Sequence, residues 1–303
     1  MRCTRMILCL EVMLLCSGCS VRRFAMKKVG DALANSGATF SSDDDPVLIK
    51  DAAPFSLKLM ESVLAQTPGH RGLLLAASRG FTQYAFAFVQ QEAEEREAGD
   101  LEAAGALQVR ARRLYLRARD YGLRGLESRH RGFAATLREN PKAAAAKITS
   151  TADVPLLYWT AASWGSAISL SKDNPDLVAD QLQVEALIDR ALQLDEGFES
   201  GALHSFLITY EWSRQGAAGD AVARSRRHFE RAMELSHGQL AAPLLALAEN
   251  VSVSRQDRRE FESLLHRALE INPDAKPEWR LENLVMQRRA RWLLARADQL
   301  FAE

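Results

Sequence analysis

The feature that most constrains the fold is a short pattern that occurs three times in the second half of the chain. Its copies are Ile188–Asp195, Phe229–Ser236 and Leu265–Asn272, and each reads apolar–x–Arg–Ala–apolar–x–apolar. The alanines of successive copies are 41 and 36 residues apart, near the period of about 34 residues of a tetratricopeptide repeat. A fourth, degenerate copy is Met60–Pro68. The pattern indicates helical hairpins in series.

Elementary packing explains why such copies come in series. A small residue lets a neighbouring helix approach closely, and each hairpin buries one face only by stacking on the next. Apolar residues return every three or four positions, and no run of alternating β-branched residues is found, which favours helices over strands. The sequence therefore predicts an all-α fold of tetratricopeptide-like hairpin repeats packed as a compact solenoid. The alternative is that such strings are merely common helical sequence.

Four cysteines indicate how the chain begins. Cys3, Cys9, Cys16 and Cys19 all precede residue 20, and no cysteine follows. A positive end, an apolar stretch and small residues before Cys19 are typical of a lipoprotein signal peptide. We expect lipidation at Cys19, although Cys16 and the charge of Glu11 depart from the usual pattern. The alternative is a short N-terminal helix of a cytoplasmic protein.

This interpretation divides the chain into three parts. Residues 1–18 are the predicted signal peptide, 19–45 the lipid anchor and N-terminal segment, and 46–303 the helical-repeat domain. Clusters of Gly, Pro and polar residues punctuate that domain. Between Phe81 and Tyr121 no proline occurs, and two long helices are expected there, largely solvated over Glu92–Arg113.

Charge and motifs argue against several function classes. Basic and acidic residues number 39 each, so no net field favours nucleic acid. The six histidines are scattered, and the sequence contains no HExxH, Walker or GxSxG motif. We predict no metal, no cofactor and no enzymatic activity. An enzyme with an unfamiliar helical site would require a cluster of titratable groups in a cleft.

Aromatic residues are the remaining candidates for binding. Tyr158, Trp159 and Trp164 fall within seven residues, and they are predicted to line an apolar pocket or a docking surface. The alternative is that they are core residues at helical spacing. Phe81, Tyr84 and Phe88, at intervals of three and four, indicate a buried helix face.

Several longer strings resemble one family, the T component associated with tripartite ATP-independent periplasmic (TRAP) transporters, called TatT. They are Phe40–Pro46, Pro68–Ala85, Leu157–Ser169, Gly201–Glu211 and Arg280–Leu294.

The resemblance implies a non-enzymatic periplasmic lipoprotein scaffold that forms a homotrimer and docks a solute-binding protein, the P component. It also implies a channel in each protomer for a small hydrophobic ligand, an organic carboxylate being one candidate. With Ser20 after Cys19, anchoring to the outer membrane is expected, with the membrane reached only through the lipid. The alternative is an outer-membrane helical-repeat scaffold for envelope assembly, with a protein client and no small ligand.

Overall fold

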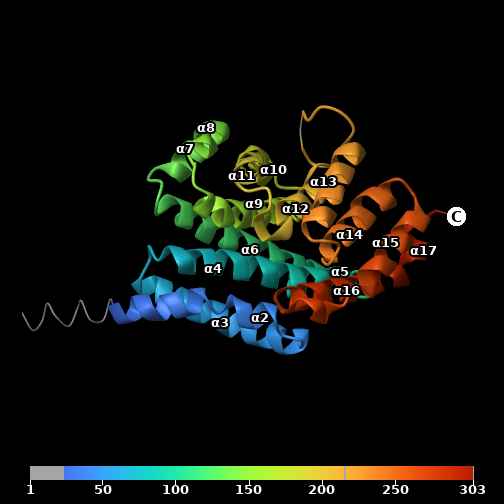
Figure 1. Cartoon of the computed structure of the whole chain (residues 1–303), viewed down its shortest axis with the longest axis horizontal. Helices are drawn as coiled ribbons and strands as arrows, with labels where there is room; N and C mark the ends of the chain where they lie inside the picture. The colour runs from blue at the N-terminus through green and yellow to red at the C-terminus, as the bar shows by residue number, and fades with distance from the viewer. Residues whose placement is uncertain (1–23, 215, 303) are drawn as a thin grey trace, which may run out of the picture.

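The computed structural model describes residues 24–214 and 216–302, which contain helices and no strand (Figure 1). The predicted all-α fold is confirmed. The predicted lipidation site Cys19 and the predicted signal peptide lie outside the described residues. No helix in the described ranges is both long and apolar enough to cross a membrane.

The described residues form a series of helices joined by short connections. The first helix covers residues 24–34. The others are α2 (Gly37–Ser41), α3 (Pro46–Gln66), α4 (Arg71–Tyr84), α5 (Gln91–Arg96), α6 (Leu101–Glu127), α7 (Phe133–Glu139), α8 (Pro141–Ala146), α9 (Val154–Ser169), α10 (Pro175–Val178), α11 (Gln181–Leu194), α12 (Ala202–Tyr210), α13 (Ala221–Leu235), α14 (Ala242–Leu247), α15 (Arg258–Glu270), α16 (Arg280–Ala295) and α17 (Ala297–Leu300). The π-helical turns are η1 (Ala85–Gln90) and η4 (Ala248–Ser252), and the 3₁₀ turns are η2 (Thr151–Asp153), η3 (Phe198–Ser200), η5 (Pro273–Ala275) and η6 (Pro277–Trp279).

The three repeat motifs lie on α11, α13 and α15. Their small residues Ala191, Ala232 and Ala268 are all fully buried, as expected for positions where a neighbouring helix approaches closely. Helix α12 packs on α13, and α14 with η4 packs on α15. This arrangement agrees with the predicted helical-repeat solenoid.

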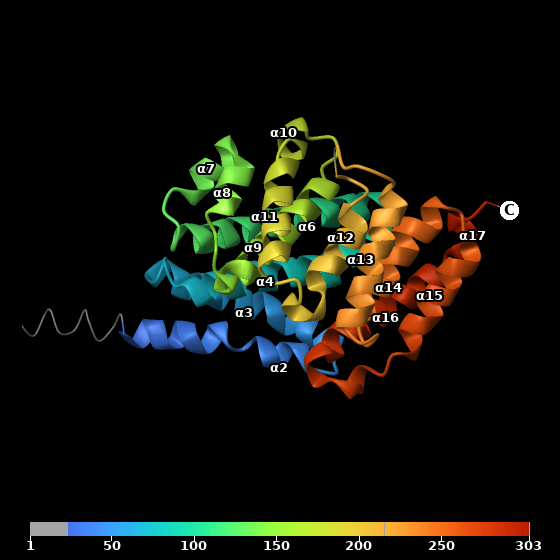
Figure 2. The same ribbon diagram turned by 45° about the horizontal axis from the view of Figure 1, so that its top comes forward.

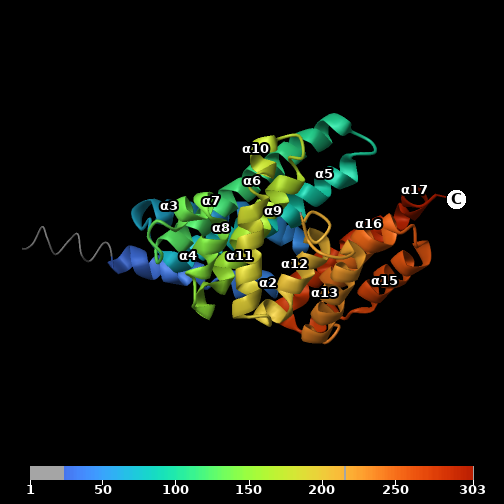
Figure 3. The ribbon, with the colours of Figure 1, turned by 90° about the horizontal axis from the view of Figure 1, so that it is seen from above.

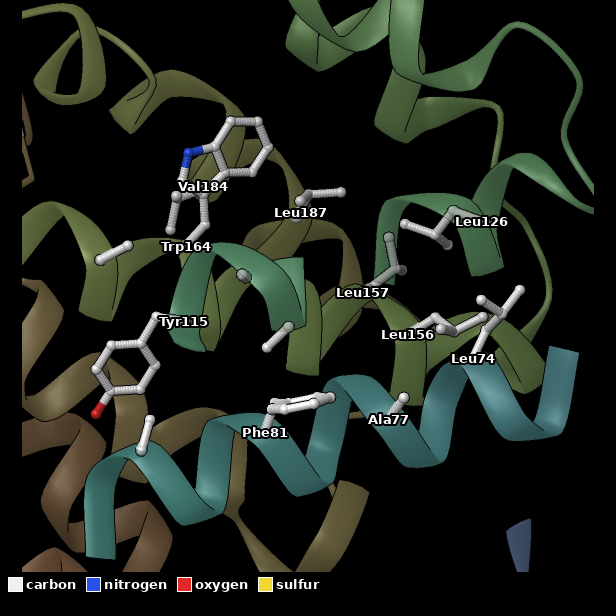
Figure 4. Packing of buried hydrophobic residues seen from close by; sticks show 14 of the residues in the cluster. Leu74, Ala77, Phe81, Tyr115, Leu126, Leu156, Leu157, Trp164, Val184 and Leu187 are labelled. Carbon is white, nitrogen blue, oxygen red and sulfur yellow. The ribbon is translucent and has the colours of Figure 1, made fainter. Parts of the chain in front are cut away.

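Helix α6 is the centre of the N-terminal half, where it packs against α4 and α9. Side chains from the three helices converge in one core, among them Phe81, Tyr115 and Leu156 (Figure 4). The backbones approach closely at Gly122, where a Cβ atom would lie 2.1 Å from Thr160 Oγ1. A side chain at this position would therefore force the helices apart.

The proline-free run forms two helical segments, as predicted. The first continues from α4 through η1 to the end of α5, and the second is α6. Phe81, Tyr84 and Phe88 are buried, which confirms the predicted apolar face. Most of Glu92–Arg113 is at least partly exposed, as expected for its charged composition.

Helix α16 returns from the C-terminal hairpins to the beginning of the chain. It contacts α14 and α15 on one side and α2 and α3 on the other (Figures 2 and 3). Arg280 Nη1 donates a hydrogen bond of 2.9 Å to the Ser42 carbonyl. The return brings the start of α16 close to residues of α4, α9 and η3, where the candidate site is found.

Candidate functional site

Three charged side chains from distant parts of the sequence form the polar half of the candidate site. Arg79 comes from α4, Glu199 from η3 and Glu282 from the first turn of α16. Arg79 Nη1 lies 3.3 Å from Glu199 Oε1. Glu282 is close enough to both for their charges to shift its pKa. It makes no hydrogen bond or ion pair with any described residue.

The aromatic half comes from α9 and η3. The rings of Tyr158 and Trp159 have centroids 4.8 Å apart, and Phe198 lies 5.5 Å from Tyr158. The Arg79 guanidinium is 5.4 Å from the Trp159 ring centroid, within cation–π range. Aromatic and charged residues therefore share one small volume.

The backbone that carries Glu199 is strained. Glu199 and Ser200 have φ values of 42° and 55°, and Gly201 follows with 96°. Two consecutive residues with a Cβ in the left-handed region are uncommon and cost about 1–3 kcal/mol each. Such strain persists where surrounding contacts fix it, and it concentrates at functional sites. Here it directs Glu199 toward Arg79.

The three charged side chains are accessible to solvent. Glu282 is exposed, and the Glu199 side chain keeps 33% of its accessible surface. Desolvation by the surrounding protein nevertheless raises the pKa of both carboxyls, and Glu199 adds to the effect at Glu282, whose pKa rises to about 7. We call this group of neighbouring side chains, Arg79, Tyr158, Trp159, Phe198, Glu199 and Glu282, the recess.

Tyr158 provides a second free polar group in the recess. Its side chain is half-buried, and its hydroxyl has no hydrogen-bond partner among the described residues. Burial, followed by the charges of Glu199 and Glu282, raises the pKa of the Tyr158 hydroxyl. The hydroxyl therefore stays protonated and is able to donate a hydrogen bond.

The structure separates Trp164 from the other two predicted aromatic residues. Its indole nitrogen donates to Asp180 Oδ2 at 3.1 Å, and Arg119 lies 5.0 Å from its ring centroid. Five residues along a helix correspond to about 140° of rotation, so Trp159 and Trp164 point in different directions. Trp164 is buried in the core cluster, whereas Tyr158 and Trp159 belong to the recess. A role of Tyr158, Trp159 and Trp164 in ligand or partner binding stays a prediction.

Sequence reasoning did not find the charged members of the recess. Arg79, Glu199 and Glu282 occur in ordinary helical sequence, and no motif marks them. Only the FESG turn at residues 198–201 offered a signal, because a glycine after polar residues marks a tight bend.

The scattered histidines also hid a contact. His204 and His228 approach within 2.8 Å through their Nδ1 atoms. Across the described ranges, no group of three or more His, Cys, Asp or Glu side chains is arranged to bind a metal ion.

A shallow depression on α6 is a different kind of feature. Arg113, Arg117, Tyr121 and Arg124 line it. Arg117 faces Glu61 at 3.7 Å, and Arg124 donates to the Pro68 carbonyl. Because two of its arginines already have partners in the protein, this surface is a weaker candidate than the recess.

The recess combines titratable groups with aromatic rings, and this raises the question of whether it could catalyse a reaction. An enzyme would require a cluster of titratable groups in a cleft, and the recess contains such a cluster. Its two carboxyls are not part of a metal-binding group in the described structure.

Comparison with known proteins gives two matches. The model of a family described as "TRAP transporter T-component" matches residues 42–301. An uncharacterized protein of Treponema pallidum (strain Nichols) is 28% identical over 307 residues, which cover 96% of this chain and 95% of that protein. The family match includes every residue of the recess.

Proposed function

Because the chain belongs to the TRAP transporter T-component family, we propose that it is a periplasmic scaffold that docks a solute-binding protein and passes a small ligand through the recess. Association with TRAP transport follows from family membership, and the family is not one of known enzymes. Docking, ligand passage and the homotrimer are the finer parts of the proposal. So is a lipid anchor at Cys19 in the outer membrane.

The recess is the observation that carries the ligand-binding part. Its side chains come from four separate elements, and it combines aromatic rings with solvent-accessible polar groups. Small-molecule sites typically have apolar walls and a few polar groups that orient the ligand.

Size-exclusion chromatography with light scattering tests the docking part. The sample is the chain from Ser20 onward, which contains every described residue, alone and mixed with a TRAP solute-binding protein of the same organism. We expect a trimer that takes up the partner. A monomer that ignores the partner would contradict the proposal and favour the alternative, a helical-repeat scaffold for envelope assembly.

A further inference from the structure

Helix α6 carries a row of arginines on the face that points away from the core. Buried residues such as Ala111 and Tyr115 mark its inner face. The arginines return at intervals of three, four and seven positions, so they lie on one side of the helix. All four are exposed. We call this set the arginine stripe: Arg110, Arg113, Arg117 and Arg124.

The stripe concentrates positive charge in a chain whose formal net charge is zero. Between its first and last members, α6 has six arginines and one acidic residue, Asp120. Arg119 engages Asp120 at 2.8 Å. Glu61 of α3 lies 3.7 Å from Arg117, but the Glu61 side chain is only 14% exposed. The outer surface of the stripe therefore keeps an excess of positive charge.

Aromatic rings support three of the four guanidinium groups. These groups lie between 5.2 and 5.9 Å from a ring centroid, in the pairs Arg110–Tyr84, Arg117–Phe81 and Arg124–Tyr121. The rings of Phe81 and Tyr121 are themselves stacked, with centroids 5.9 Å apart. Guanidinium groups pack favourably on aromatic faces. Side chains that are already held in place lose less conformational entropy when a partner binds.

The depression on α6 lies within the stripe and has a volume of about 400 Å³. Arg113 is the free group at its wall, because it makes no hydrogen bond or ion pair with another described residue. Leu116 adds an apolar contact surface. The shallow shape is unfavourable for holding a small molecule, but it leaves the depression accessible to a segment of a larger partner.

The choice of arginine indicates the chemistry of that partner. Helix α6 contains no lysine. The planar guanidinium pairs with a carboxylate through two parallel hydrogen bonds, which the lysine ammonium does not do. Arginine and tyrosine are also enriched in protein–protein interfaces, where lysine is depleted. The stripe therefore fits the carboxylates of a protein better than it fits the headgroups of a membrane surface.

From this arrangement we infer that the arginine stripe docks an acidic segment of a partner protein, whose carboxylates pair with Arg113 and the neighbouring guanidinium groups across the depression. The inference rests on the proposed function, in which the partner is the solute-binding protein. It adds the surface and the chemistry of the contact.

A second copy of the chain is a poorer match for the stripe. Two acidic tracts are present, Asp43–Asp45 and Glu92–Glu97. In the first, Asp43 and Asp45 accept backbone hydrogen bonds at the start of α3. In the second, three of the four glutamates pair with basic residues of the same chain, which are Lys50, Arg96, Arg288 and Arg289. Both tracts are largely engaged, which favours a different protein as the partner.

Biolayer interferometry tests the inference. The chain from Ser20 onward is immobilised, and a TRAP solute-binding protein of the same organism is the probe. Charge pairs at an interface are screened by salt, so we expect the affinity to fall as NaCl rises from about 50 to about 500 mM. An affinity that does not depend on salt would contradict docking through the stripe.

Arg113→Glu reverses one charge without breaking a contact inside the protein. We expect it to weaken binding by about tenfold or more and to reduce the salt dependence. Arg259→Glu is the matched control, because Arg259 is an exposed arginine on α15 and its replacement changes the net charge equally. Circular dichroism verifies that both variants fold. Equal effects of the two variants, or no effect of Arg113→Glu, would overturn the inference while leaving docking itself intact.

A second probe applies if the solute-binding protein does not bind at all, which would remove the docking role. Fluorescence anisotropy then measures binding of a labelled oligoglutamate peptide to the same variants. Binding that Arg113→Glu weakens and Arg259→Glu does not would support an acidic protein partner other than the solute-binding protein. Absence of peptide binding would overturn the inference.

Two further outcomes would assign the stripe to another occupant. Phosphatidylglycerol vesicles that bind more tightly than either protein probe, in a manner that requires Arg113, would assign it to lipid headgroups. Self-association that is lost in Arg113→Glu would assign it to a second copy of the chain. Either result would overturn the inference.

Discussion

The contact between His204 and His228 gives stability a dependence on pH. Burial lowers the pKa of both rings, and the charge of His204 helps to bring that of His228 to about 4. The unfolded chain therefore binds protons more readily, near pH 6.5, than the folded chain does. We expect the free energy of unfolding to fall as pH drops from about 6.5 toward 4, as measured by urea denaturation.

A variant is needed to isolate this effect, because Glu282 acts in the opposite direction. Its raised pKa makes the folded state less stable as pH rises from about 4.5 to 7. His228→Asn should weaken the loss of stability in acid, whereas His266→Asn, at an exposed position on α15, should not. A His228→Asn variant with an unchanged pH profile would show that the pair has no such role.

At the level of single residues, the sequence predicted the local features and missed the distant ones. The N-terminal cap of α3 is a local feature, because Asp45 stands directly before Pro46 and its Oδ1 accepts hydrogen bonds from Val47 N and Leu48 N at 2.9 and 3.0 Å. Glu282 is an example of a miss. Its pKa is raised by desolvation and then by the charge of Glu199, and neither cause is visible in the neighbouring sequence.

Among the elements, the crossing of α4, α6 and α9 depends on Gly122. A Cβ there would lie 2.1 Å from Thr160 Oγ1 and 3.0 Å from Ser78 Oγ, and Thr160 is further fixed by its bond to the Leu156 carbonyl. We expect Gly122→Ala to lower the free energy of unfolding by about 1–3 kcal/mol through overpacking.

Gly105 on the same helix is the matched control. A Cβ added at Gly105 would meet nothing within 4 Å, so Gly105→Ala should raise the free energy of unfolding by up to about 1 kcal/mol through helix propensity. Urea denaturation followed by circular dichroism measures both changes. Effects of equal sign would show that the crossing is looser than these distances indicate.

Helical periodicity predicted where helices occur, but it did not predict where they contain π-helical turns. The burial of the alanines on α11, α13 and α15 follows from apolar residues that recur every three to four positions. The π-helical turns η1 and η4 do not, because one extra residue in a turn is decided by packing and has no strong sequence signal. Glu94, just after η1, and Glu249, within η4, both pair with Arg289 of α16. No local sequence pattern predicts these long-range pairs.

For the whole molecule, the most important contact is made by α16, which packs against α2 and α3 as well as against α14 and α15. The two apolar clusters of the chain lie largely on separate sets of helices, and Arg289 joins them. Its Nη1 lies 2.6 Å from Glu94 Oε2 on α5, while Nε donates to Glu249 Oε1 in η4 at 2.8 Å. The Arg289 side chain is only 10% exposed, so its charge depends on these two carboxylates.

Replacing Arg289 tests whether its ion pairs hold α16 against α5 and η4. Arg289→Met leaves Glu94 and Glu249 without their partner, and we expect the free energy of unfolding to fall by about 2 kcal/mol. This value lies below that for a fully buried pair because both carboxylates keep about a quarter of their surface exposed. Arg288→Met, whose side chain is 50% exposed and pairs with Glu95, should cost less than about 1 kcal/mol.

Hydrogen exchange distinguishes local loosening from uniform destabilisation. Because Glu282 lies on the same helix, two turns before Arg289, loosening of α16 would also displace Glu282. We expect Arg289→Met to increase amide exchange in α16 and in the α2 and α3 segments that it contacts, while α11 stays protected. Equal acceleration in α11 would mean that the two clusters unfold as one unit, and that Arg289 contributes to global stability without specifically holding α16 in place.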